Sequence, residues 1–226
     1  MADFTAVITG ASRGIGAAVT EAYAEAGGQM VLGAREASSL EAIADGIDAT
    51  PVAVDVRDED SVAAFVDAAA AELGTFDVVL ANAGVYQGPS GKTPLPADSY
   101  ERFDEHMATN ARGVFATVKE AQEHLAPAGR VLVPSGKPAR EPTPGSGSYA
   151  VSKAAAEAVA RGFSADLDQA VGVVDPGQVQ TDLTEKEFGR TPDEVAGLYV
   201  WAAREAPTET IDGAVTGIKE WLQATR

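Results

Sequence analysis

Short apolar runs alternate with longer amphipathic segments along almost the whole chain. Between the runs, apolar residues recur every three or four positions, as they do over residues 62–73. This alternation predicts an α/β fold with a three-layer αβα, doubly wound parallel sheet, Rossmann-like, of about seven strands. The candidate strands are residues 5–8, 30–33, 51–54, 77–81, 130–134, 171–174 and 214–218.

Length and composition narrow this prediction. A chain of 226 residues suits one domain, which we expect to cover residues 1–226. With no cysteine and only two histidines, His106 and His124, the chain is not expected to bind a metal. Residues 1–10 run directly into the first strand without a basic leader or a long apolar stretch, so we expect a soluble, cytoplasmic protein.

The net charge of −17 comes from 34 acidic against 17 basic side chains. Such a surface repels nucleic acid and anionic membranes, so neither is an expected partner. Two interpretations stay open: a well-solvated acidic protein, or a halophilic protein from a cytoplasm where concentrated salt screens self-repulsion.

Residues 9–16, with the sequence TGASRGIG, lie between the first strand and a helical segment. Gly10, Gly14 and Gly16 let the backbone turn tightly and approach a ligand, and the first helical turn offers unpaired N–H groups to an anion. Ser12 and Arg13 add side-chain donors. The stretch therefore predicts a phosphate site, although a tight turn without a ligand has the same pattern.

The second strand is followed by Arg35 and Glu36. In dinucleotide-binding folds an arginine here accepts the 2′-phosphate of NADP, whereas a carboxylate accepts the ribose hydroxyls of NAD. Arg13 and Arg35 can both donate paired hydrogen bonds to one phosphate, which favours NADP(H). Glu36 leaves NAD(H) possible, and Arg35 is alternatively an ordinary surface residue in an ion pair.

Two asparagines are notable, one after a strand and one in an apolar helical stripe. Asn82 follows the fourth strand, where its amide can bridge neighbouring strand ends. Asn110 shares a helical stripe with Phe103, Met107 and Val114, so its amide must find buried partners or water. It is either a satisfied core amide that bends the helix or part of a site.

Tyr149 and Lys153 are four residues apart at the start of a helical segment, which places phenol and ammonium on one face. A nearby cation favours phenolate and lowers the tyrosine pKa toward a range useful for acid–base chemistry. Ser135 follows the fifth strand, where it can hydrogen-bond a substrate oxygen. After the sixth strand, residues 174–181 make a rigid turn that ends in a hydroxyl.

Together these motifs resemble those of the classical short-chain dehydrogenase/reductase family, from Thr5 to about Asp182. Residues 9–16 are similar to its T-G-x-x-x-G-x-G, which includes Ile15. Asn82-Ala83-Gly84 is similar to its N-N-A-G, Tyr149 with Lys153 to its Y-x-x-x-K, and residues 176–181 to its P-G-x-x-x-T. In this order and spacing the set is highly specific.

The resemblance implies a role for each residue in turn. Tyr149 would be the general acid or base, Lys153 would lower its pKa and hold the nicotinamide ribose, and Ser135 would orient the carbonyl. Asn110 would hold a water that links Lys153 to solvent. Asp55, with Val56 beside it, would contact adenine, and Arg13 and Arg35 would mark NADP preference. Nicotinamide would lie beside the turn that contains Pro176, Gly177, Val179 and Thr181.

The chain departs from the family pattern at three places. Ala81 replaces the first asparagine of N-N-A-G. Thirteen residues separate Ser135 from Tyr149 where the family usually has twelve, so Gly136 occupies the strict spacing. Only about ten residues separate Thr181 from the helix start at Thr191, which predicts an open or small lid and an accessible substrate.

We therefore expect an NADP(H)-dependent short-chain oxidoreductase that interconverts a small carbonyl compound and its alcohol by hydride transfer. The alternative is a catalytically inactive NADP-binding regulator or sensor, which the extra residue before Tyr149 and the short lid would favour. The helices over residues 98–125 and 149–167 match those that form dimer contacts in the family, so a homodimer or homotetramer is expected.

Overall fold

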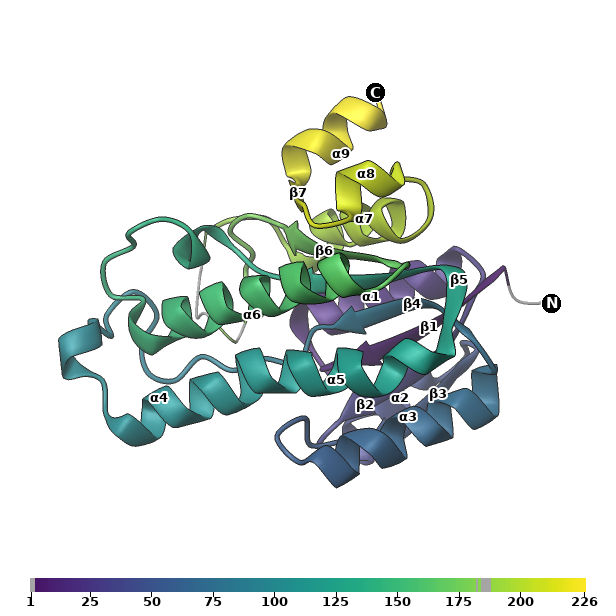
Figure 1. The fold of residues 1–226 in the computed structure, drawn as a ribbon, viewed down its shortest axis with the longest axis horizontal. Helices are drawn as coiled ribbons and strands as arrows, with labels where there is room; N and C mark the ends of the chain where they lie inside the picture. The colour runs from purple at the N-terminus through teal and green to yellow at the C-terminus, as the bar shows by residue number, and fades with distance from the viewer. Residues whose placement is uncertain (1–2, 182, 184–187) are drawn as a thin grey trace.

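Seven parallel strands form one sheet in the order β3-β2-β1-β4-β5-β6-β7 (Figure 1). The computed structural model describes residues 3–181, 183 and 188–226. The strands are β1 (Phe4–Thr9), β2 (Gly28–Ala34), β3 (Ala49–Ala53), β4 (Phe76–Ala81), β5 (Leu125–Pro134), β6 (Ala170–Asp175) and β7 (Val215–Gly217). All seven predicted strands are present, and the predicted doubly wound α/β fold is confirmed.

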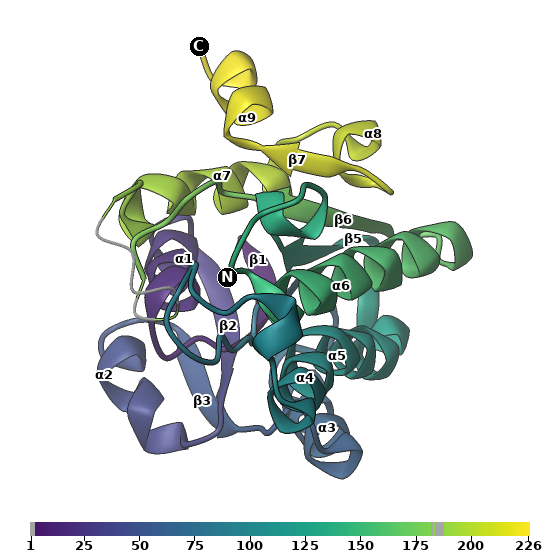
Figure 2. The ribbon, with the colours of Figure 1, turned by 90° about the vertical axis from the view of Figure 1, so that its left-hand side faces the viewer.

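Helices follow most strands. They are α1 (Gly14–Glu25), α2 (Glu41–Ala44), α3 (Glu59–Leu73), α4 (Tyr100–His106), α5 (Gly113–Ala121), α6 (Gly147–Asp166), α7 (Pro192–Arg204), α8 (Thr208–Ile211) and α9 (Ile218–Ala224), with short 3₁₀ turns between some of them. Figure 2 shows α3, α5 and α6 on one side of the sheet and α1 and α7 on the other.

The two faces of the sheet carry different side chains because successive strand residues point to opposite sides. Val7 pairs in register with Val31 and Val79, and this valine face packs beneath α3, α5 and α6. Ile8 pairs with Leu32 and Leu80, and this face packs beneath α1 and α7. Both faces are buried, which explains why the strands read as continuous apolar runs.

The helix expected over residues 98–125 is interrupted. Between α4 and α5 lies a π-helical segment, Met107–Arg112, and a 3₁₀ turn, Gln122–His124, follows α5. Two contacts lie at or beside the widened turn. The Asn110 side chain bonds to the backbone of Val85, and Gly113 packs so closely that a Cβ there would lie 2.7 Å from a methyl carbon of Val56.

The strand order reverses between β1 and β4, so the connections leaving these two neighbouring strands run to opposite sides. Ligands of such sheets bind outside the carboxyl ends of the strands at this point. The Asn82 side-chain amide donates to the Gly10 oxygen at 2.9 Å and to the Thr9 oxygen at 3.2 Å. The prediction that Asn82 bridges neighbouring strand ends is confirmed.

Candidate functional site

A cavity of about 650 Å³ opens at the carboxyl ends of β1, β2 and β4. Most residues predicted to bind a dinucleotide line it: Gly10, Ser12, Arg13, Gly14, Ile15, Arg35, Asp55, Val56, Asn82, Ala83, Gly84 and Thr181. The other predicted residues do not contribute to its lining: Gly16, Tyr149, Lys153, Pro176, Gly177 and Val179. The cavity is therefore formed mainly by residues predicted to bind the cofactor, but of those predicted beside the nicotinamide only Thr181 lines it.

The glycine-rich turn forms one wall of this cavity. Gly10 and Gly14 have positive φ angles of 68° and 56°, which side chains rarely adopt. A Cβ on Gly16 would lie 2.1 Å from the Gly10 oxygen, so Gly16 is required for the turn to close although it does not line the cavity. No side chain caps α1 at Arg13, so the first N–H groups of this helix remain able to bind an anion.

Four polar side chains surround the cavity where a 2′-phosphate was predicted: Arg13, Arg35, Glu36 and Ser39. Arg13 and Arg35 can donate hydrogen bonds to a phosphate, and Glu36 can accept them from a ribose. The Ser39 hydroxyl donates its hydrogen to the Glu36 backbone oxygen at 2.6 Å. Ser39 was not predicted from the sequence.

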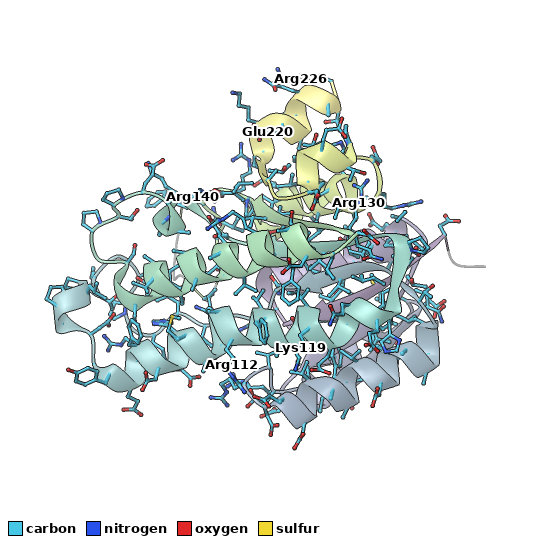
Figure 3. All side chains as sticks on the ribbon, viewed as in Figure 1. Arg112, Lys119, Arg130, Arg140, Glu220 and Arg226 are labelled. Atoms are coloured by element: carbon cyan, nitrogen blue, oxygen red, sulfur yellow. The ribbon has the colours of Figure 1, made fainter. Side chains whose placement is uncertain are left out.

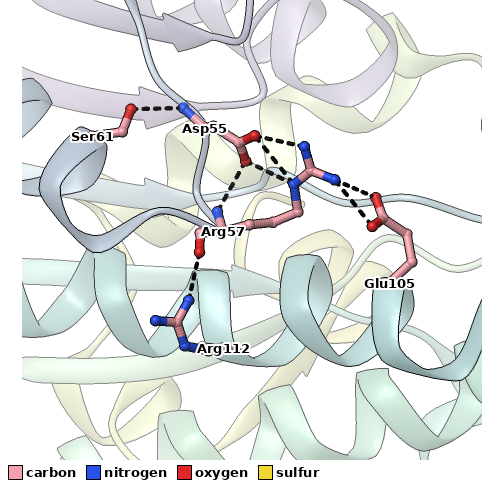
Figure 4. Close-up of polar contacts among 5 residues, drawn as sticks. All are labelled: Asp55, Arg57, Ser61, Glu105 and Arg112. Carbon is pink, nitrogen blue, oxygen red and sulfur yellow. Dashed lines mark hydrogen bonds and ion pairs between the residues drawn. The ribbon is translucent and has the colours of Figure 1, made fainter. Parts of the chain in front are cut away.

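Arg57, which was not predicted from the sequence, binds the carboxylate of Asp55 (Figure 4). Arg57 Nη2 lies 2.6 Å from Asp55 Oδ2, and Arg57 Nη1 lies 3.0 Å from both carboxylate oxygens of Glu105. The hydrogen bonds from Arg57 hold the pKa of Asp55 below its usual value. This ion-pair chain lines the cavity and connects the β3–α3 loop with α4.

Thr109 lines the same cavity with its side-chain hydroxyl unpaired. Its Oγ1 is buried and has no hydrogen-bond partner among the described residues. A buried hydroxyl without a partner costs about 1–3 kcal/mol, so this atom fits a polar ligand in the cavity. Thr109 was not predicted from the sequence, because a threonine one residue before Asn110 is unremarkable in a helical pattern.

Tyr149 and Lys153 lie one turn apart near the start of α6, as predicted. Burial, with smaller contributions from Tyr86 and Asp175, raises the pKa of Tyr149 to about 12. Burial lowers the pKa of Lys153 to about 8, against the opposing charge of Glu157. The expectation that Lys153 lowers the Tyr149 pKa is wrong for the protein alone, because burial disfavours both charged forms.

Asn110 is fully satisfied by its neighbours. Its side-chain oxygen accepts from the Val85 N–H at 2.7 Å, and its nitrogen donates to the Val85 oxygen and to Ser152 Oγ. Ser152 Oγ in turn donates to the backbone oxygen of Tyr149. Both sequence interpretations of Asn110 are therefore compatible with its position: it is a satisfied buried amide in a distorted helix, and it is linked to the first turn of α6.

Ser135 lies at the end of β5 and points toward α6. Its hydroxyl donates to Glu157 Oε1 at 2.6 Å, and the same oxygen accepts from Arg140, which is labelled in Figure 3, at 2.5 Å. Arg140 also pairs with Asp175. Gly136, at the strict family spacing, has room for a side chain: a Cβ there would be 3.7 Å from its nearest neighbour, Pro138 Cδ.

After Pro176, two segments of the chain, residues 178–180 and 188–190, are joined by backbone hydrogen bonds. We call this pair of segments the neck. The Gln180 N–H donates to the Arg190 oxygen at 2.8 Å, and the Arg190 N–H donates to the Gln178 oxygen at 3.0 Å. Thr191 then caps α7, which confirms the predicted helix start. The predicted lid lies partly outside the described residues.

Within the part of the chain that the structure describes, no cluster of side chains suits a metal ion. None of the helices described is long and apolar enough to span a membrane.

Fold and site together define a Rossmann-like α/β protein with a cavity at its glycine-rich turn and a tyrosine–lysine pair on α6. Comparison with known proteins identifies the family: the model for short chain dehydrogenases matches residues 4–191. The chain belongs to the short-chain dehydrogenase/reductase family of oxidoreductases.

Its relatives cover most of the chain. A gluconate 5-dehydrogenase of Gluconobacter oxydans is 30% identical over 191 residues, which is 80% of this chain and 73% of that protein. A versicolorin reductase of Emericella nidulans is 33% identical over 79% of this chain and 70% of that protein.

Solved structures agree with these relatives. An alcohol dehydrogenase of the archaeon Thermococcus sibiricus, complexed with 5-hydroxy-NADP, has a TM-score of 0.84 and 31% identity over 95% of each chain. A dehydrogenase/reductase of Sinorhizobium meliloti has a TM-score of 0.85 and 29% identity over 96% of this chain and 94% of that one.

Proposed function

We propose that the protein uses NADP(H) to interconvert a carbonyl compound and an alcohol, with Tyr149 as the general acid in reduction and the general base in oxidation. The observation that carries this proposal is the arrangement of Tyr149 and Lys153 on α6 of a short-chain dehydrogenase fold, together with a 650 Å³ cavity at the glycine-rich turn. The relative complexed with 5-hydroxy-NADP supports the same cofactor class.

The residues of the cavity fit a dinucleotide. The uncapped start of α1 suits a diphosphate, Arg13 and Arg35 suit a 2′-phosphate, and Thr109 has an unused hydroxyl among the described residues. Adenine would lie by Asp55 and Val56, and the nicotinamide by residues 176–181. Glu36, which also lines the cavity, leaves NAD(H) as a second cofactor.

When bound, the nicotinamide supplies or accepts the hydride. A Tyr149 pKa of about 12 keeps the phenol protonated at neutral pH, so it is ready to donate its proton to a carbonyl oxygen. Lys153 would hold the nicotinamide ribose with its ammonium group, which a pKa of about 8 leaves mostly charged at neutral pH. Asn110 would hold a water that links Lys153 to solvent, and it would do so by accepting a hydrogen bond from that water, because both hydrogens of its side-chain amide are already donated.

Ser135 would orient the carbonyl oxygen of the substrate. Its single hydroxyl hydrogen is donated to Glu157, so this role requires that hydrogen bond to be exchanged for one to the substrate. We further propose a cytoplasmic homodimer or homotetramer made through α5 and α6, where Phe115 is 46% exposed beside Phe163.

The test is the absorbance change of NADPH or NADH in the presence of a panel of ketones and aldehydes. Replacing Tyr149 with Phe should lower turnover roughly 10²- to 10⁴-fold, because the proton donor is lost while the ring remains. Cofactor affinity, measured by fluorescence, should change little.

Tyr100→Phe is the matched control, because Tyr100 is 92% exposed at the start of α4. Full turnover in Tyr149→Phe would refute Tyr149 as the proton donor. NADPH binding without any turnover across the panel would instead favour the inactive regulator or sensor.

A further inference from the structure

A buried histidine that the proposed reaction does not use lies against Tyr149. His106 is the last residue of α4 and is 1% exposed. Its ring centroid lies 6.1 Å from those of Tyr86 and Tyr149, in edge-to-face contact with both. The Tyr86 and Tyr149 rings are themselves 4.7 Å apart, so the three rings form one cluster.

The hydrogen bonds of His106 define its tautomer. The backbone N–H of Gln87 donates to His106 Nε2 at 3.0 Å, and a backbone N–H can only donate, so Nε2 carries a lone pair. The ring hydrogen is therefore on Nδ1, which donates to Ser148 Oγ at 2.8 Å. His106 is thus neutral, and both of its nitrogens are used.

These two bonds connect the segments that carry the neighbouring tyrosines. Gln87 directly follows Tyr86, after β4, and Ser148 directly precedes Tyr149 in the first turn of α6. Ser148 is fully buried, and its N–H donates to Asp98 Oδ2 at 2.6 Å. His106 therefore joins the segment after β4 to the start of α6 at the position of Tyr149.

We propose that neutral His106, with its hydrogen on Nδ1, is a positioning residue for Tyr149, and that protonation of Nε2 displaces Tyr149 and stops turnover at acidic pH. Protonation removes the acceptor of the Gln87 N–H and places two donors against each other. A misplacement of about 1 Å can cost roughly 100-fold in rate. This inference rests on the proposed function of Tyr149.

The charges around His106 determine the direction of the effect. Asp98, paired with Arg102, faces it from before α4, Glu105 precedes it in α4, and Tyr86 and Tyr149 face it from the other two segments. Burial lowers the His106 pKa below its usual value, against the opposing charge of Asp98. The neutral form therefore persists at neutral pH and is lost only as the pH falls through the lowered pKa.

The test compares the pH profile of kcat for carbonyl reduction, between pH 5 and 9, in wild type, His106→Gln and His106→Phe. Gln retains an acceptor at the position of Nε2 but does not titrate, whereas Phe retains only the ring. His106→Phe should lower kcat at pH 8 about 10- to 100-fold, with the Kd for NADPH unchanged. His106→Gln should recover most of that loss and lack the fall at acidic pH.

His124→Gln is the matched control, since the chain has only these two histidines. Nitrogen NMR of the wild-type imidazoles gives a second measurement, in which His106 should be the Nδ1–H tautomer and remain neutral to a lower pH than His124. The inference is overturned if an active wild type and His106→Gln share the same acid fall, or if His106 is the Nε2–H tautomer. A wild type without any turnover would instead refute the proposed function.

Discussion

The proposed cofactor preference depends on single residues of the cavity. Arg13 and Arg35 line it together with Glu36, so donors for a phosphate and an acceptor for ribose hydroxyls lie at the same end. A charge-assisted hydrogen bond contributes about 1.5–3 kcal/mol, which is more than an exposed ion pair contributes. We therefore expect NADP(H) to be preferred.

Replacing Arg35 with Ala should raise the Kd for NADPH roughly 10- to 100-fold and change that for NADH only slightly, because NADH lacks the 2′-phosphate. Fluorescence titration with both cofactors measures this. Arg161→Ala removes one positive charge from an exposed position of α6 and serves as the control. Equal losses for NADPH and NADH would contradict the assignment of Arg35.

The residues that sequence reasoning identified differ in kind from those it missed. Tyr149 and Lys153 are found from the sequence because one helical turn places them together. Arg57 and Glu105 are 48 positions apart and meet only through the fold. Burial is also not apparent from the spacing of residues. It raises the Tyr149 pKa, whereas the spacing alone predicted that Lys153 would lower this pKa.

Among the elements, α7 begins at a capping box. The Glu194 N–H donates to Thr191 Oγ1 at 3.3 Å, and the Thr191 N–H donates to Glu194 Oε2 at 2.8 Å. The motif T-P-D-E made this start predictable, because each of its residues acts locally. The interruption of the helix before α5 was not predictable, since it depends on contacts with Val85 and Val56 from other segments.

Replacing Thr191 with Ala should lower the free energy of unfolding by about 1 kcal/mol, because the cap hydrogen bond is lost. Urea denaturation followed by circular dichroism measures the change. Thr208 is exposed at a helix start and does not cap it, so Thr208→Ala should have a smaller effect. An equal loss in both variants would show that the capping box contributes nothing specific.

The boundaries of the elements are harder to predict from a sequence pattern than their presence. The fifth strand was predicted from residue 130, but β5 begins at Leu125, which pairs with Phe76 before a shift of register. The buried core of the strand repeats valine and leucine and is therefore visible in the sequence. Its start contains Pro127 and Gly129, which read as a turn until the neighbouring strand is known.

At the scale of the whole molecule, the net charge of −17 has two interpretations, a well-solvated acidic protein and a halophilic protein. At low salt, like charges on a folded surface repel one another and lower stability. Because concentrated salt shortens the Debye length to about 3 Å at 1 M, a protein adapted to high salt gains stability as this repulsion is screened.

We expect the thermal midpoint to rise between 0.1 and 2 M KCl. If screening contributes about 2 kcal/mol, the rise is roughly 4–8 °C for a chain of this size. Scanning calorimetry measures it, with sucrose as a non-ionic control that stabilises folded proteins by exclusion. A midpoint that is constant or falls with KCl would favour the well-solvated acidic protein over the halophilic one.

The neck at residues 178–180 and 188–190 has a consequence for how this protein changes over evolutionary time. Backbone hydrogen bonds join its two segments, and α7 begins directly afterwards with Thr191 as its N-cap. Lengthening a closed loop costs little, about 0.6 kcal/mol for each doubling. The stretch between the two halves of the neck can therefore gain or lose residues while the sheet and α7 stay in place.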